Sequence, residues 1–189
     1  MEHTSPVLPP DQRPPWDELA PFPASRVSDR TPMIVGHRGA AGLVPENTLA
    51  AFQVAADLRI NDVEFDVQCT RDGHLVVFHD NEVDRVTDGS GLIYDMTLDE
   101  VKRLDAGRAF YARFRGERVP TLRDTDLLLM VELKDPWRFP GVEADVAHLI
   151  REYGLADRAS VRSFYHSTLH AMFRIAPRAH RAVVRPPAR

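Results

Sequence analysis

The chain has 189 residues, of which 43% are hydrophobic, and a formal net charge of −4; these values fit one sizeable globular domain and argue against the basic surface of a nucleic-acid-binding protein. Cys69 is the only cysteine, so an internal disulfide is excluded. No apolar run approaches the ~20 residues that span a bilayer, and residues 1–10 lack the basic and apolar parts of a secretion signal, so we expect no transmembrane segment and a cytoplasmic location.

The chain begins with a proline-rich segment. Seven of the 15 prolines lie within residues 1–31. Because proline fixes its backbone angle and lacks an amide hydrogen, such a segment resists both helix and sheet. We therefore expect an extended tail at 1–31 and one domain at 32–189.

The domain opens with a strand and a helix. Residues 33–36 form a short apolar run that ends at His37. Apolar residues then recur at helical spacing over 49–60, directly after the capping residue Thr48. A buried strand followed by an amphipathic helix is the repeating unit of α/β folds.

The next two strands should form a hairpin. Residues 63–67 alternate as a strand, and a second strand is predicted at 74–79. Too few residues separate them for a crossover helix, and the Asp-Gly pair at 72–73 is a strong signal for a two-residue turn. Such a turn places Asp66 opposite His79.

The rest of the chain alternates between strands and helices after a charged insertion. Residues 81–120 are rich in charge and glycine and contain one short helix, capped by Thr97 with Glu100 three residues on. Further strands are predicted at 127–133, 160–164 and 182–184, and further helices at 142–153 and 169–173. This order predicts an α/β fold with a largely parallel sheet.

Charged side chains and histidines stand where four of these strands end. In a parallel barrel the carboxyl ends of the strands converge on one rim, where active sites form. Three carboxylates there would repel one another unless a hard cation such as Mg²⁺ or Ca²⁺ joined them. Two histidines could then act as general base and acid, while an arginine and a lysine hold a phosphate. The residues are His37, Arg38, Glu64, Asp66, His79, Glu132 and Lys134.

Each of these features is ordinary when it occurs alone. A His-Arg-Gly sequence is most often a simple turn, and an isolated strand carboxylate usually faces solvent. The joint occurrence of these features, in order, at the ends of four apolar strands favours phosphoryl chemistry over these readings.

The order of motifs resembles that of glycerophosphodiester phosphodiesterases over roughly residues 33–176. The matching segments are GHRGAAGLVPENTLAAF at 36–52, VEFDVQCTRDGHLVVFHD at 63–80, DRVTDGSG at 84–91 and VELK at 131–134. The resemblance implies a TIM barrel whose small insertion after the third strand, here 81–120, covers the substrate site. It also implies the hydrolysis of a glycerophosphodiester to an alcohol and glycerol 3-phosphate.

The resemblance also implies a role for individual residues. It casts His37 as catalytic base and His79 as catalytic acid, Arg38 and Lys134 as phosphate ligands, Glu64, Asp66 and Glu132 as ligands of one divalent cation, Mg²⁺ or Ca²⁺, and Glu46 and Asn47 as supporting residues.

The sequence also departs from this family pattern. Without its tail, the chain is well short of the ~250 residues of a typical barrel, and six strands can be placed. The nine residues at 122–130 leave little room for the usual helix, and Arg162 stands where the family prefers a small polar residue.

We therefore predict a truncated TIM-type α/β barrel with impaired activity and open sheet edges that could pair two copies of the chain. Two alternatives stay open: a non-catalytic remnant of the family, and a phospholipase similar to sphingomyelinase D.

Overall fold

The computed structural model of the protein describes residues 34–60, 62–125 and 130–184. The tail predicted at 1–31 lies outside the described residues, as does Met33 of the first predicted strand. The elements in chain order are β1 (Val35–His37), α1 (Leu49–Asp57), β2 (Asp62–Cys69), β3 (Leu75–Val77), η3 (Ile93–Asp95), α2 (Leu98–Val101), η4 (Ala112–Phe114), η5 (Leu122–Asp124), β4 (Met130–Leu133), η6 (Pro136–Arg138), α3 (Val142–Glu152), β5 (Ser160–Ser163), α4 (His166–Ile175) and β6 (His180–Val183).

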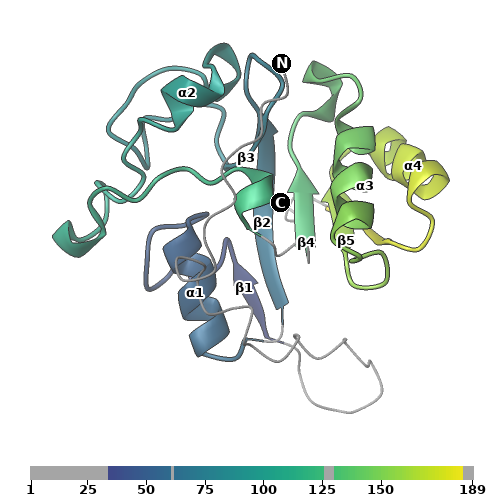
Figure 1. Cartoon of the computed structure of the whole chain (residues 1–189), viewed down its shortest axis with the longest axis horizontal. Helices are drawn as coiled ribbons and strands as arrows, with labels where there is room; N and C mark the ends of the chain where they lie inside the picture. The colour runs from purple at the N-terminus through teal and green to yellow at the C-terminus, as the bar shows by residue number, and fades with distance from the viewer. Residues whose placement is uncertain (1–33, 61, 126–129, 185–189) are drawn as a thin grey trace, which may run out of the picture.

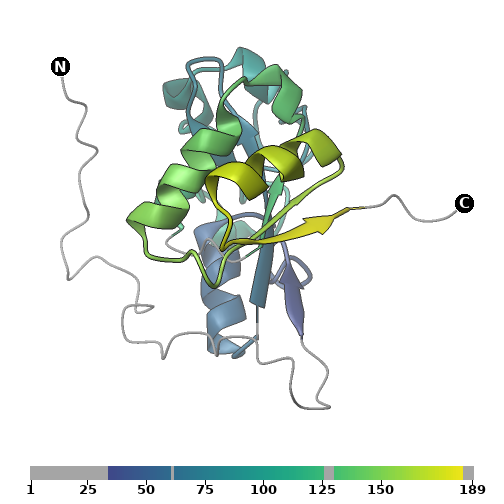
Figure 2. The same cartoon turned by 90° about the vertical axis from the view of Figure 1, so that its right-hand side faces the viewer.

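The strands form one sheet in which five run parallel. Its order is β1-β2-β4-β5-β6, with β3 pairing antiparallel to β2 beside β1. Helices α3 and α4 lie side by side on one face of this sheet (Figures 1 and 2). Buried residues of α1, α3 and α4 join one hydrophobic core with the strands, so the predicted α/β fold with a largely parallel sheet is confirmed.

The two faces of the sheet differ in chemistry because side chains alternate along each strand. On β2, Val63, Phe65 and Val67 are buried and pack in the core beneath the helices. Glu64 and Asp66 point to the opposite face. Carboxylates and apolar side chains can therefore share one strand without a charge entering the helix-facing core.

The loop after β1 is pressed closely against α1. Thr48 caps the helix by accepting a hydrogen bond from the amide of Ala51. Gly39 has φ +79°, and a Cβ atom placed on it would lie 2.7 Å from the Cβ of Ala51. Since both the backbone angle and the space require glycine, this contact fixes where the residues that follow β1 lie.

The β2–β3 hairpin is antiparallel as predicted, but its predicted register is wrong by one residue. The amide of Thr70 donates to the carbonyl of His74, which leaves a three-residue loop that ends at Gly73, with φ +86°. A three-residue loop that closes on a left-handed glycine uses the same Asp-Gly signal as a two-residue turn. As a result the amide of Phe78 donates to the carbonyl of Asp66, and His79 does not face Asp66.

The insertion at 81–120 has a small hydrophobic core of its own. Eight buried residues form it, and two of them come from the third strand and its end. They are Val76, Phe78, Val83, Ile93, Val101, Leu104, Ala106 and Val119. The predicted capping box of Thr97 and Glu100 is present at α2.

The sequence predicts that the usual helix before β4 is missing or collapsed. The structure has a short 3₁₀ turn, η5, in its place. Residues 126–129, which include the start of the strand predicted at 127–133, lie outside the described residues.

Within the described ranges, β1 pairs only with β2, and β6 pairs only with β5. Val35 on the first of these edges is 37% exposed and Val183 on the second is 43% exposed. Pairing of two copies through these edges stays a prediction. Among the described helices, none combines the length and apolar character that a membrane crossing requires.

Candidate functional site

Three buried carboxylates meet on the face of the sheet opposite the helices. Glu64 and Asp66 lie on β2, and Glu132 lies on β4 directly beside Asp66 in the sheet register. One carboxylate oxygen of each residue lies within 4.8 Å of the other two. Oxygen donors at this spacing suit a hard divalent cation, so the predicted acidic cluster is confirmed as a group that could hold a metal ion.

Two cationic side chains partly neutralise this cluster. The Nζ atom of Lys134 lies 3.0 Å from Oδ1 of Asp66 and also forms an ion pair with Glu132. The Nε atom of Arg38 lies 3.4 Å from Oδ2 of Asp66. Three carboxylates against two cations leave an excess of negative charge.

Burial and neighbouring negative charge both act on the carboxyl of Glu64. Burial raises the pKa of its carboxyl from 4.5 to about 7, and the nearby charges of Asp66 and Glu132 add to the rise. A carboxylate that is this costly to ionise gains much from a nearby cation. The cluster therefore fits a divalent metal ion in its charge as well as in its spacing.

The end of β1 brings His37 and Arg38 to the same cluster. His37 lies beside Glu64 in the sheet register, and its Nε2 atom is 3.8 Å from Oε2 of Glu64. The side chain of His37 is 71% exposed, so it can reach a bound molecule. Arg38 adopts φ +51°, and its amide donates to Oε2 of Glu64 at 3.1 Å.

Glu46 and Asn47 support these groups from the loop before α1. The side-chain Nδ2 atom of Asn47 donates to Oδ2 of Asp66 at 3.0 Å. The backbone amide of Asn47 donates to the carbonyl of Arg38 at 3.1 Å. Oε1 of Glu46 accepts from NH1 of Arg38 at 2.8 Å. Hydrogen bonds of this kind orient metal ligands and phosphate ligands, and the supporting role implied for both residues stays a prediction.

His79 reaches the cluster only through other side chains. It lies beyond the end of β3, where its Nδ1 atom is 2.5 Å from Oδ1 of Asp80. Burial tends to raise the pKa of Asp80, but hydrogen bonds from Arg85 and His79 outweigh it and lower that pKa. Asp80 is therefore an ionised acceptor, so Nδ1 of His79 is the donor and Nε2 takes no part in this hydrogen bond.

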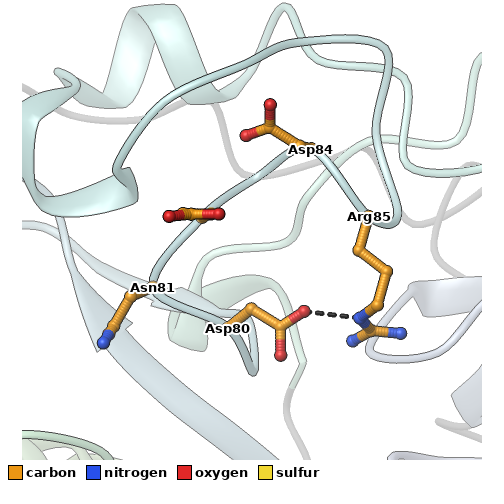
Figure 3. A pocket seen from close by; sticks show the side chains of 5 residues that line it. Asp80, Asn81, Asp84 and Arg85 are labelled. Carbon is orange, nitrogen blue, oxygen red and sulfur yellow. Dashed lines mark hydrogen bonds and ion pairs between the residues drawn. The ribbon is translucent and has the colours of Figure 1, made fainter.

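A cavity of about 530 Å³ borders Asp80, the residue that His79 contacts. Its lining residues are Asp80, Asn81, Glu82, Asp84 and Arg85. Figure 3 shows the side chain of Arg85 turned toward that of Asp80, with an ion pair between them. Sequence reasoning gave no role to Arg85, although this arginine stands alone within an acidic stretch of the insertion.

Eight of the nine predicted site residues thus form one connected group, and His79 joins it through Asp80 and Arg85. This geometry can be compared with that of known proteins. A profile of the glycerophosphoryl diester phosphodiesterase family matches residues 37–184. The chain belongs to this family.

Relatives in the glycerophosphoryl diester phosphodiesterase family agree with this assignment. A glycerophosphodiester phosphodiesterase from Caldanaerobacter subterraneus is 44% identical over 153 residues, which cover 77% of this chain and 63% of that relative. The crystal structure of a glycerophosphodiester phosphodiesterase from Agrobacterium tumefaciens matches with a TM-score of 0.71 at 36% identity, and covers 80% of this chain and 66% of that one.

An Oleispira antarctica phosphodiesterase, solved in complex with the product sn-glycerol-3-phosphate, matches with a TM-score of 0.69 at 34% identity. The match covers 83% of this chain and 68% of that structure. The predicted TIM-type α/β class is confirmed, and the six described strands form part of such a barrel. The chain spans 63% of the length of the Caldanaerobacter relative and 66% of that of the Agrobacterium structure.

Proposed function

We propose that the chain hydrolyses a glycerophosphodiester to an alcohol and glycerol 3-phosphate with the help of one divalent cation. The observation that carries the proposal is the meeting of three buried carboxylates, two cationic side chains and His37 on one face of the sheet. Two relatives support the same reaction: a glycerophosphodiester phosphodiesterase, and a phosphodiesterase solved with the product sn-glycerol-3-phosphate.

Glu64, Asp66 and Glu132 would hold the cation through carboxylate oxygens, the donor type that both Mg²⁺ and Ca²⁺ prefer. A bound cation supplies Lewis-acid stabilisation of the negative charge that develops on the phosphoryl oxygens. It would also replace Lys134 and Arg38 as the main partner of the carboxylates, and so make both side chains available to a phosphate group.

The two histidines would move the protons of the reaction. His37, the more exposed of the two, takes a proton from the attacking water molecule as the water oxygen bonds to phosphorus. His79 gives a proton from Nε2 to the alcohol oxygen as the bond between phosphorus and that oxygen breaks. Meanwhile Arg38 offers a planar fork of donors to the phosphate and Lys134 a compact positive charge.

A hydrolysis assay on glycerophosphocholine tests this function. We expect release of choline and glycerol 3-phosphate in the presence of Mg²⁺ or Ca²⁺, complete loss of release with a chelator, and recovery when the cation is restored. Sphingomyelin serves as the comparison substrate, because its faster cleavage would favour the alternative of a sphingomyelinase D-like enzyme. Folded, metal-loaded protein that cleaves neither substrate would favour a non-catalytic remnant.

Cation binding is expected to depend on pH through Glu64. Because burial and neighbouring charge raise the pKa of this carboxyl to about 7, a proton and the cation compete for it. Affinity should rise about tenfold per pH unit as pH approaches 7 and level off above it. Calorimetric titration between pH 5.5 and 8.5, in buffers with different ionisation enthalpies, would measure both the affinity and the protons released.

The stability of the metal-free protein should follow the opposite trend. The folded-state pKa of Glu64 lies above its ordinary value of 4.5, so the stability that protonation provides is complete below 4.5 and is lost as pH rises through 7. The variant Glu64→Gln cannot ionise at this position. Its cation affinity and its metal-free stability should therefore both depend less on pH than those of the wild type. A metal affinity that stays constant across this range would contradict the prediction.

A further inference from the structure

Arg85 extends from the insertion to carboxylates in two other loops. Its Nε atom donates to Oδ2 of Asp80 at 2.5 Å. Its NH1 and NH2 atoms donate to the two carboxylate oxygens of Glu46, at 3.0 Å and 2.6 Å. All three nitrogens of the guanidinium are therefore engaged, by residues that lie 5 and 39 positions away in the chain.

Each of these two carboxylates also contacts a residue with a proposed role in the reaction. Oδ1 of Asp80 lies 2.5 Å from Nδ1 of His79. Oε1 of Glu46 lies 2.8 Å from NH1 of Arg38. Arg85 is thus the centre of a chain of contacts that runs from His79, the proposed acid, to Arg38, the proposed phosphate ligand.

The charges of this group fit a positioning role. Burial tends to raise the pKa of Glu46, but hydrogen bonds from Arg85 and Arg38 outweigh it and lower that pKa. Since Glu46 and Asp80 both stay ionised, each can only accept hydrogen bonds. Their donors, His79 and Arg38, are then held in fixed orientations by the same guanidinium.

We propose that Arg85 is a positioning residue. It orients His79 by holding Asp80, and it orients Arg38 by holding Glu46, so that His79 and Arg38 keep a fixed arrangement relative to each other. The proposal rests on the proposed function for its catalytic meaning. It gives the insertion a part in the reaction, because a residue of the insertion connects the loop after β1 with the loop after β3. Substrate phosphate held by Arg38 and the alcohol oxygen protonated by His79 would thereby keep a constant separation.

The contacts require arginine rather than positive charge alone. A guanidinium presents its donors in a rigid planar fork, whereas the ammonium of lysine is a single point charge on a flexible chain. Lysine at position 85 could neutralise one carboxylate, but its single nitrogen could not reproduce the contacts that three separate nitrogens of Arg85 make with Asp80 and Glu46. Replacement by lysine therefore separates the effect of charge from that of geometry.

The experiment compares Arg85→Gln and Arg85→Lys with a matched control, Arg178→Gln. Arg178 also makes a two-donor ion pair, with Asp157, and that pair is more exposed and lies outside the site. We expect both variants at 85 to lower kcat on glycerophosphocholine by about 10- to 100-fold, the usual effect of removing an orienting partner. The control should retain full activity, and all three proteins should still bind the cation.

A second measurement does not depend on activity. The Nδ1 proton of His79, held by Asp80, should give a downfield resonance in the NMR spectrum of the intact protein. It can be assigned by its loss in Asp80→Asn. We expect Arg85→Gln and Arg85→Lys to broaden or remove this resonance, and Arg178→Gln to leave it unchanged. If wild-type protein hydrolyses nothing, the proposed function fails while this measurement still tests the position of His79.

Two outcomes would overturn the proposal. One is a His79 resonance that stays unchanged in Arg85→Gln, and the other is a lysine variant that recovers both wild-type kcat and the wild-type resonance. Should Arg85→Gln not fold, Arg85→Lys and Glu46→Gln provide the same comparison. Glu46→Gln keeps Arg85 in place and should weaken the resonance less than Arg85→Lys does, because the contact of Arg85 with Asp80 remains.

Discussion

Replacing His37 or His79 with alanine is expected to lower kcat on glycerophosphocholine by about two orders of magnitude or more, the usual contribution of a general base or acid. The side chain of His37 is 71% exposed and that of His79 31% exposed. Neither belongs to the buried core, so the melting temperature should change little. Turnover and thermal unfolding measured on the same samples would therefore separate a loss of chemistry from a loss of fold.

A histidine outside the site provides the matched control. His148 lies on α3, and its side chain is 63% exposed and contacts Glu152 one helical turn away. His148→Ala should retain wild-type turnover. If hydrolysis persists in the double variant of His37 and His79, the reaction takes place elsewhere on the protein or comes from a contaminant.

The second large effect is expected from Asp66→Asn. Asp66 is 1% exposed and receives contacts from Asn47, Arg38 and Lys134 as well as lying within the carboxylate cluster. Loss of its charge removes the ion pairs that buried Asp66 makes with the partly buried side chains of Arg38 and Lys134, and removing one partner of a buried ion pair typically costs about 3–5 kcal/mol of stability. We also expect divalent cation binding to become undetectable by calorimetry, because one of the three ligands becomes a weak neutral donor.

Asp62→Asn is the control for this experiment. Asp62 lies on the same strand and the same face as Asp66 but outside the group of three carboxylates. Burial raises the pKa of its carboxyl, so a neutral amide should be tolerated there, with cation binding unchanged. Equal loss of binding in both variants would mean that the whole strand, and not the cluster, determines the affinity.

The acidic cluster could be predicted from sequence because it depends on a simple periodicity. Glu64 and Asp66 are two residues apart on one strand, so they share a face whatever the register. Glu132 ends another apolar strand of the same parallel sheet. These two facts place three carboxylates at one rim without any knowledge of loops, and the described geometry agrees.

The hairpin register could not be predicted in the same way. An Asp-Gly pair favours a left-handed glycine, but a two-residue turn and a three-residue loop both use one. The choice here depends on Thr70, whose side-chain oxygen accepts from the amide of His74 and donates to Asp72. One residue of slip moves every partner along the strand, and this slip is why Phe78, and not His79, lies opposite Asp66.

The link through Arg85 could not be predicted from sequence either. Its contact with Glu46 joins two loops that are 39 residues apart and follow no regular period. The family resemblance pointed to Glu46 as a supporting residue, but the nature of the support depends on a side chain in an irregular insertion. Only the packing of that insertion against the sheet brings the two together.

The close approach of Gly39 to Ala51 makes the position of His37, the proposed base, depend on helix α1. A Cβ atom at Gly39 would lie 2.7 Å from the Cβ of Ala51, which is fully buried in α1. The methyl group of Ala51 therefore acts as a spacer that sets how far the loop after β1, and with it the end of β1 at His37, lies from helix α1. A larger residue at position 51 lies outside the site, yet we expect it to displace His37 and Glu64 beside it. Variants of this chain that share every residue of the site can therefore differ in turnover because of the residue at position 51 in α1.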